Sequence, residues 1–279
     1  MIHVVCLTKS YSDVDFRTWV EWYTKILHIE GSKGRLHIVD NESSVELQPI
    51  LEELCPGSYT YEKVAGWPDQ YGLYADILNE NRFGLAQDDL IMFLDDDEFL
   101  YFFEDYDHHC FADLEDALRH QFNQLNCALI PQILMSSKVL PETRTQNVIE
   151  QALYRRGDIE TQGKSIIRYD KDSKYRFKKT GCKENGHVPW INGIRMSDIH
   201  GGYGVSKTTY AEVDYNSPIQ LYHYHMKSLS DWEKKINRGS AACPSQWYDS
   251  DPRKNKTYGG YDFLELSMYC KWHMYKHDK

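Results

Sequence analysis

The sequence lacks long apolar runs and paired cysteines, and each absence excludes a common class of protein. No window approaches the roughly 18 consecutive apolar residues that a membrane-spanning helix needs. The seven cysteines are scattered and contain no CxxC pair, which argues against a zinc site and a disulfide framework. The opening MIHVVCLTKS holds too short an apolar run for a signal peptide and predicts a β-strand. We therefore expect a cytoplasmic protein with reduced thiols and no transmembrane segment.

Basic charge is also scarce. The chain has 42 acidic residues against 32 basic ones, for a net charge of −10. Because binding to a phosphate backbone requires a net basic face, we expect no nucleic-acid partner. A smaller phosphorylated ligand can still bind where a cation or a few local Lys and Arg residues offset the acidic charge. The sequence has neither the GxxxxGK[ST] pattern of a P-loop nor the glycine-containing loop of an EF-hand.

Predicted strands and helices alternate through residues 1–100. Short apolar runs predict strands at 2–7, 35–39 and 90–94, and apolar residues at helical spacing predict helices at 15–27, 45–55 and 70–81. This alternation predicts an α/β domain with a mostly parallel, mixed central sheet flanked by helices. In such sheets, ligands bind at the carboxyl ends of the strands.

The rest of the chain continues the mixture of strands and helices. We predict strands at 128–134, 165–168 and 219–226, and helices at 113–126, 230–237 and 262–275. Pro131 favours an edge position or a bend for the first of these strands. Glycine-rich residues 181–204 predict a long loop. Because no repeat or linker interrupts the chain, we expect a single domain over residues 1–279.

Four consecutive acidic residues stand at the end of the strand at 90–94, in the stretch IMFLDDDEFL. Carboxylates this close repel one another, so a partly buried cluster requires a cation or raised pKa values. Mg²⁺ and Mn²⁺ prefer oxygen ligands and would relieve the repulsion. The alternative is a solvated strand end with Asp96 and Glu98 pointing outwards. The apolar residues on both sides favour a metal site within this cluster, in which Glu98 would be structural.

Two other polar groups are expected near this cluster. Asp40 and Asn41 follow the strand at 35–39, so they should lie at the same sheet edge. On the strand at 219–226, His223 and His225 share one face with Lys227 beyond them. Histidine can ligate a metal and lysine can pair with phosphate oxygens. Two histidines and a lysine on an exposed strand surface are the alternative.

In their order along the chain, several motifs resemble the family 2-like and family 92-like glycosyltransferases, which have the GT-A fold. The strongest pieces are FLDDDEF, similar to the family's D-x-D-E-F, and HYxxKS at residues 223–228. The segments that complete the resemblance are Glu21-Trp22, VDNESS at 39–44, Gln70 at the start of a helix, GKSIIR at 163–168 and a loop with His200. Residues 171–186 and the tail after Ala242 depart from the family pattern.

The resemblance implies a glycosyltransferase that uses a nucleotide-diphosphate sugar donor and a glycan or glycoconjugate acceptor. Residues 1–100 would form the nucleotide-binding half, residues 101–242 the acceptor-binding half and residues 243–279 a helical tail. Asp95 and Asp97 would hold Mn²⁺ or Mg²⁺ against the diphosphate, with His223 as a further metal ligand. The residues implied in donor binding are Thr8, Asp40, Asp96, His200 and Lys227.

An inverting glycosyltransferase also needs a carboxylate base for the acceptor hydroxyl. The candidates are Asp198, which we prefer because it lies two residues before His200, and Glu184. Two alternative functions use similar features: a metal-dependent phosphoesterase or nuclease, and a non-catalytic carbohydrate-binding protein of the same fold. The identity of the sugar depends on the shape of the pocket and of its loops, which the sequence pattern does not define.

Overall fold

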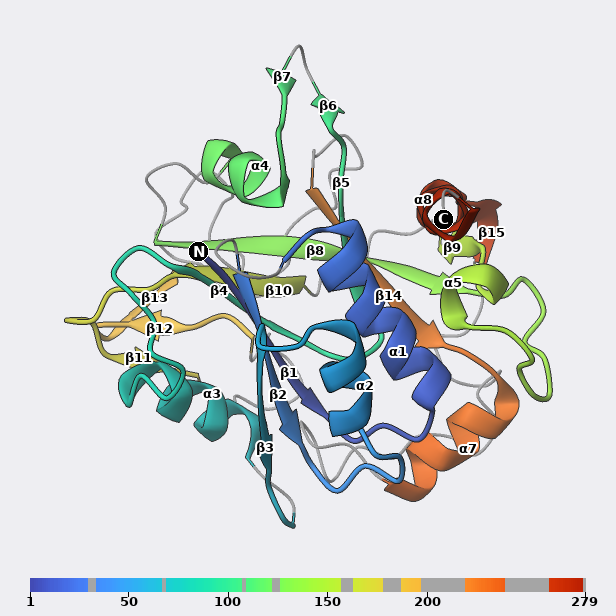
Figure 1. The fold of residues 1–279 in the computed structure, drawn as a ribbon, viewed down its shortest axis with the longest axis horizontal. Helices are drawn as coiled ribbons and strands as arrows, with labels where there is room; N and C mark the ends of the chain where they lie inside the picture. Colours follow the sequence, from blue (N-terminus) through green and yellow to red (C-terminus); the bar gives the residue numbers. More distant parts are fainter. Residues whose placement is uncertain are drawn as a thin grey trace.

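A computed structural model describes residues 1–29, 34–66, 69–106, 109–121, 126–156, 163–177, 187–196, 219–238 and 261–277. These residues build a ten-stranded mixed sheet with helices on its faces, so the predicted α/β class is confirmed (Figure 1). A three-stranded and a two-stranded sheet accompany the main one. In the described part of the chain, no helix is long and apolar enough to cross a membrane.

The N-terminal part supplies four adjacent parallel strands, in the order β4, β1, β2, β3. The strands are β1 (Ile2–Thr8), β2 (Gly34–Asp40), β3 (Tyr59–Lys63) and β4 (Leu90–Leu94). The helices between them are α1 (Asp13–Glu21), which continues as the π-helix Trp22–Ile26, α2 (Gln48–Leu54) and α3 (Gln70–Asn79). The alternation predicted from the sequence is confirmed, and β3 is an additional strand at the edge of the sheet.

Helices cover both faces of this sheet, so its strands are buried on both sides. Along β1, Val4 and Cys6 belong to one hydrophobic cluster and Val5 to the other, as the alternating direction of strand side chains requires. The first cluster includes side chains of α1 and α2, and the second includes side chains of α3. α1 and α2 therefore cover one face of the sheet and α3 the other (Figure 1).

Antiparallel pairs extend the sheet beyond β4. β10 (Gly163–Arg168) runs antiparallel to β4 and joins it to β8 (Cys127–Ser136), which also pairs with β14 (Ile219–Met226). The remaining strands of the sheet are β5 (Glu98–Phe102), β9 (Tyr154–Arg156) and β15 (Tyr261–Leu264). The helices of this part are α4 (Leu114–Gln121), α5 (Val148–Gln151), α7 (Leu229–Arg238) and α8 (Ser267–His277).

Three details of the second half differ from the sequence predictions. β8 is an interior strand, so the edge predicted as one of two alternatives for Pro131 is wrong: residues 127–131 pair with β10, residues 132–136 with β14, and Met135 and Ser136 also with β9. Pro131 lies where the partner changes from β10 to β14. The segment predicted as one helix at 262–275 begins with β15, which pairs with β9, before α8 starts at Ser267. Within the predicted loop, β12 (Trp190–Ile191) and β13 (Ile194–Arg195) pair in a small sheet with β11 (Tyr175–Arg176).

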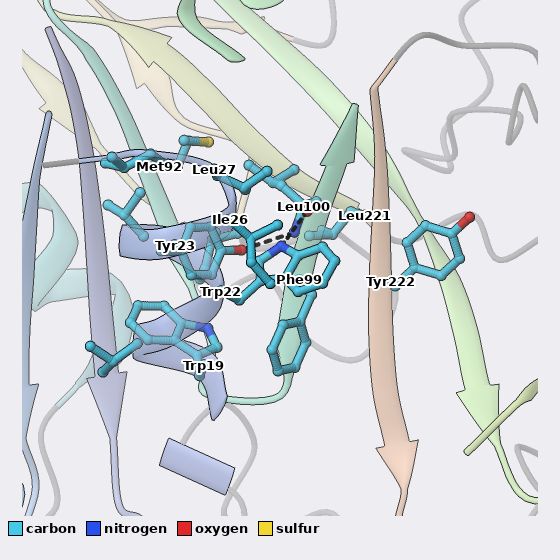
Figure 2. Packing of buried hydrophobic residues seen from close by; sticks show 14 of the residues in the cluster. Trp19, Trp22, Tyr23, Ile26, Leu27, Met92, Phe99, Leu100, Leu221 and Tyr222 are labelled. Atoms are coloured by element: carbon cyan, nitrogen blue, oxygen red, sulfur yellow. Dashed lines mark hydrogen bonds between the residues drawn. The ribbon is translucent and has the colours of Figure 1, made fainter. Parts of the chain in front are cut away.

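Aromatic side chains of α1 and the π-helix fix the backbone of β5, which directly follows the acidic cluster. Among the described strands, β5 pairs with β14 on one side. On its other side, Trp19 Nε1 and Tyr23 Oη each donate to the carbonyl oxygen of Glu98 at 3.0 Å. Trp22 Nε1 donates to the carbonyl oxygen of Leu100 at 2.7 Å (Figure 2). Buried indole and phenol groups thus satisfy carbonyls that a neighbouring strand would otherwise bind.

Candidate functional site

The acidic cluster lies in the turn between β4 and β5, at the carboxyl ends of the parallel strands. β1 ends beside it, and Thr8 Oγ1 donates a 2.7 Å hydrogen bond to Asp96 Oδ2. In the register of β1 with β2, Thr8 is opposite Asp40. The structure therefore brings Thr8, Asp40 and the three aspartates to one edge of the sheet, as the sequence pattern predicted for Asp40 and the aspartates.

A buried lysine, which the sequence reasoning missed, compensates much of the negative charge. Lys164 Nζ lies 2.9 Å from Asp95 Oδ2 and 3.1 Å from Glu98 Oε2, and its side chain is 3% exposed. Ile166 of the antiparallel strand β10 pairs with Met92, so Lys164 extends alongside the end of β4. A single lysine within the otherwise uncharged start of this strand was the available sequence signal.

Burial and ion pairing together shift the pKa values of Asp95, Glu98 and Lys164. Burial is the largest single effect on Asp95 and opposes its ionisation, but the charge and the hydrogen bond of Lys164, together with a smaller effect of His187, lower the pKa of that carboxyl. For Glu98, which is fully buried, burial is the largest effect and raises the pKa to about 7. Burial works against the charged form of Lys164, yet Asp95 and Glu98 together raise its pKa well above the ordinary value.

Glu98 also positions the neighbouring groups, as expected of a structural residue. Its Oε2 accepts a hydrogen bond from the backbone N–H of Asp95, at 2.9 Å, and closes the acidic turn. Its Oε1 accepts from Gln132 Nε2 at 2.6 Å, and Gln132 Oε1 lies 3.2 Å from His223 Nδ1. His223 is paired with Glu98 across β14 and β5, so the strand register itself fixes this arrangement.

The other ring nitrogen of His223 faces the acidic cluster. His223 Nε2 lies 3.4 Å from Asp97 Oδ1, and both side chains are about one-sixth exposed, at 15% and 16%. Asp95 is turned towards Lys164 instead. Among the residues that the structure describes, no group of three or more His, Cys, Asp or Glu side chains is placed to hold a metal ion. The metal role predicted for Asp95, Asp97 and His223 stays a prediction.

The ligand atoms of Asp97 and His223 are nevertheless of chemical types that bind divalent cations. A carboxylate oxygen and an imidazole nitrogen are ligands that Mn²⁺ accepts, and their 3.4 Å separation is close to that of two ligands of one ion. Hard cations at phosphate sites commonly use few protein ligands and take the others from water and phosphate oxygens. Two protein ligands therefore agree with a site that is completed by a diphosphate.

A pocket of about 90 Å³ opens beside Asp96 and Asp97. Its lining combines carboxylates with cationic and hydroxyl groups from the loop after β1, from α1, from β14 and from α7. The lining residues are Lys9, Ser10, Tyr11, Ser12, Asp15, Asp96, Asp97, His225, Lys227, Asp231, Trp232 and Lys234. Lys227 Nζ lies 3.6 Å from Asp15 Oδ2 and 4.0 Å from Asp97 Oδ2. Positive and negative groups thus line the same cavity beside the carboxyl ends of the parallel strands.

Asp40 is engaged within the protein. Its side chain is buried, its Oδ1 accepts from the backbone N–H of Ser43 at 2.8 Å, and its Oδ2 accepts from Tyr61 Oη at 2.6 Å. These bonds shape the polar turn after β2, whose Ser43 Oγ accepts from the N–H of Ser10 at 2.8 Å. Asp40 therefore supports the loop at the rim of the pocket, and its predicted contact with a donor base stays a prediction.

His187 is a further site residue that the motif analysis left unassigned. Its ring lies edge-on to Tyr71, with centroids 5.7 Å apart, and its backbone carbonyl accepts from Ser165 Oγ at 2.7 Å. Burial, with a smaller effect of Lys164, lowers the pKa of His187 to about 3. It is therefore a neutral imidazole near physiological pH. The predicted residues Glu184, Asp198 and His200 lie outside the described residues.

No protein-family model matches the chain, and no curated protein matches it in sequence. The solved structures to which it is similar include 4-diphosphocytidyl-2C-methyl-D-erythritol synthase, with 13% identity over 60% of this chain and 75% of that chain, at a TM-score of 0.33. They include the galactosyltransferase LgtC in complex with donor and acceptor sugar analogues, with 11% identity over 81% and 87% of the two chains and a TM-score of 0.32. An active-site mutant of LgtC has 14% identity over 61% of this chain and 58% of that one, at a TM-score of 0.27. TM-scores this low do not establish a shared fold, so the α/β architecture rests on the strand order and register given above.

Proposed function

We propose that the chain is a metal-dependent glycosyltransferase that moves a sugar from a nucleotide-diphosphate sugar to a hydroxyl of a glycan or glycoconjugate, with inversion. The observation that carries the proposal is the convergence of Asp97, His223 and Lys227 beside a pocket at the carboxyl ends of the parallel strands. The motif order read from the sequence supports the same function.

The site residues have distinct proposed tasks. Asp97 and His223 hold Mn²⁺ or Mg²⁺, which supplies Lewis-acid stabilisation of the departing diphosphate when bound. Lys227, whose ammonium lines the pocket, binds phosphate oxygens and offsets the charge that develops on them. Thr8 orients Asp96 towards the rim through its 2.7 Å hydrogen bond. Asp198 or Glu184 takes the proton of the acceptor hydroxyl.

Lys164 reduces the repulsion between the carboxylates of the acidic turn. Without a cation, Asp95, Asp97 and Glu98 would place three carboxylates within one partly buried turn. Because Lys164 pairs with Asp95 and Glu98, the protein itself offsets part of the charge nearest the interior. The compensation left to a bound cation is then concentrated at Asp97, on the pocket side.

Isothermal titration calorimetry with UDP and GDP, with and without Mn²⁺, tests the proposal. We expect one of the two nucleotides to bind in the presence of Mn²⁺ and to bind much more weakly with EDTA. The absence of binding of either nucleotide with Mn²⁺ would contradict a nucleotide-sugar enzyme. Hydrolysis of a panel of UDP- and GDP-sugars without acceptor then identifies the donor, whereas hydrolysis of simple phosphoesters instead would indicate a phosphoesterase.

A further inference from the structure

One buried guanidinium ties together two helices that border the pocket. Arg144 lies between β8 and α5, and its side chain is 9% exposed. Its Nη1 donates to Asp15 Oδ1 at 2.9 Å and its Nη2 donates to Asp15 Oδ2, which makes a bidentate pair with α1. Its Nε donates to Asp231 Oδ2, in the first turn of α7, at 2.7 Å. Arg144 itself is absent from the pocket lining, whereas both of its partners belong to it.

The same two helices flank Lys227. The ammonium of Lys227 lies 3.6 Å from Asp15 and 4.0 Å from Asp97, both longer than the roughly 2.7–3.2 Å of a hydrogen bond. Ser228, the next residue, donates to Asp231 Oδ2 at 2.6 Å and its Oγ accepts from the N–H of Asp231 at 3.1 Å. The backbone after Lys227 is thereby fixed to the start of α7, while the ammonium stands between two carboxylates without closing on either.

Competition for Asp15 explains this geometry. A buried carboxylate beside an ammonium normally forms a short, charge-assisted hydrogen bond with it. Here both oxygens of Asp15 already accept from Arg144, whose planar fork matches a carboxylate. We propose that Arg144 is a positioning residue: by occupying Asp15, it keeps the Lys227 ammonium available to the phosphate groups of a ligand in the pocket. The inference rests on the proposed function in that Lys227 is taken to bind phosphate.

Affinity measurements on three variants test the inference. Arg144→Met frees Asp15 to capture Lys227, and we expect about a tenfold weaker binding of anions, the loss of roughly one charge-assisted hydrogen bond. Adding Asp15→Asn to Arg144→Met removes the competing carboxylate and should restore most of that affinity. Arg17→Met is the matched control, because Arg17 is also bidentate to a carboxylate, Glu53, on the exposed side of the same helix; its affinity should equal that of the wild type.

Two probes separate this inference from the proposed function. UDP with Mn²⁺ tests both, whereas pyrophosphate with Mg²⁺ tests the anion site without a nucleotide. Wild-type binding of pyrophosphate with loss in Arg144→Met and recovery in the double variant supports the inference, even where UDP does not bind and the proposed function fails. Unchanged affinity in Arg144→Met, a further loss in the double variant, or no binding of either probe to the wild type would overturn it.

Arg144 is buried, so thermal unfolding of each variant accompanies the titrations. A merely structural role would lower the melting temperature and add the losses of the two substitutions, whereas competition predicts recovery of affinity in the double variant. If Arg144→Met does not fold, Asp15→Asn alone decides the matter. With the competing carboxylate gone, we expect it to bind pyrophosphate at least as tightly as the wild type, and weaker binding would contradict the inference.

Discussion

The ammonium of Lys164 lies 2.9 Å from Asp95 Oδ2, inside the protein and 69 residues away along the chain. The same ammonium is 3.1 Å from Glu98. This pairing explains how a strand can end in four consecutive acidic residues without exposing all of them. Lys164 offsets part of the charge of Asp95 and Glu98 from within, whereas Asp96 and Asp97 face the pocket.

Removing the internal cation should destabilise the fold strongly. In Lys164→Met, Asp95 and Glu98 lose their common partner, and breaking a buried ion pair typically costs about 3–5 kcal/mol. Urea denaturation at pH 7 measures the free energy of unfolding. Lys63→Met is the control, since Lys63 is 61% exposed and 4.0 Å from Glu46, and such a surface pair contributes about 0–1 kcal/mol. Equal stability of Lys164→Met and the wild type would show that the buried pair is not needed.

The aromatic contacts of the π-helix should contribute to stability through hydrogen bonding as well as packing. Trp22→Phe leaves the buried carbonyl of Leu100 without its indole donor, which we expect to cost about 1–3 kcal/mol beyond the loss of ring area. Trp272→Phe loses a similar area, but its partner is the half-buried carboxylate of Glu150, which can bind water instead. The excess of the first loss over the second, from chemical denaturation, isolates the cost of the orphaned carbonyl. Two equal losses would assign the contribution to packing alone.

Asp97 should be essential for metal-dependent binding of the donor. Asp97→Ala removes the carboxylate that faces His223, so we expect Mn²⁺ to have no effect on nucleotide affinity in this variant. The melting temperature without ligand should stay within a few degrees of the wild type, because Asp97 is partly exposed. Asp76→Ala, at an exposed position of α3, should keep the Mn²⁺ dependence. Retention of full Mn²⁺-dependent affinity in Asp97→Ala would contradict the metal assignment.

A buried pair of histidines predicts sensitivity to acid away from the pocket. His37 Nε2 lies 2.8 Å from His3 Nδ1, and His37 Nδ1 lies 2.8 Å from Thr60 Oγ1. Burial, with smaller effects of the charges of His3 and Arg35, lowers the pKa of His37 to about 3. The unfolded chain takes up a proton near its ordinary pKa of 6.5 and the folded chain does not. The stability due to the neutral ring is therefore present above pH 6.5 and is lost as the pH falls from there towards 3.

The variant His37→Gln checks this dependence. It should be less stable than the wild type at pH 7.5, and the difference in the free energy of unfolding should shrink by about 2 kcal/mol on going to pH 5. A constant difference for His37→Gln over this range would contradict the lowered pKa.

Much of the fold could be predicted because its signals are local. The periodicity of Phe16, Trp19 and Tyr23 indicated a helix, and the apolar run before Asp95 indicated a buried strand. Predictions were wrong where pairing between distant segments decided the structure. Pro131 favours an edge or a bend; the edge is wrong, because β8 pairs with β10, with β14 and with β9. β15 was predicted as part of a helix, and its strand conformation depends on pairing with β9.

The candidate site could likewise be predicted only in part from the sequence. Its position at the carboxyl ends of the strands could be predicted, because the order of strands and polar turns is written in the sequence. The ion-pair partners of Lys164 and Arg144 could not be assigned, because the sequence contains many acidic residues and does not show which of them a given Lys or Arg meets in the folded protein. Glu184, Asp198 and His200 lie outside the described residues, so the identity of the base stays a prediction.

The sequence by itself determined that a dense negative charge sits where a buried strand ends, next to other polar turns of an α/β sheet. Only the tertiary structure decided which groups lie against that charge: Lys164 beside Asp95 and Glu98, and His223 and Lys227 on the side of Asp97. The physical reason is that helix and strand formation depend on neighbours along the chain. Charge compensation instead depends on distance in space and on burial, which folding alone defines.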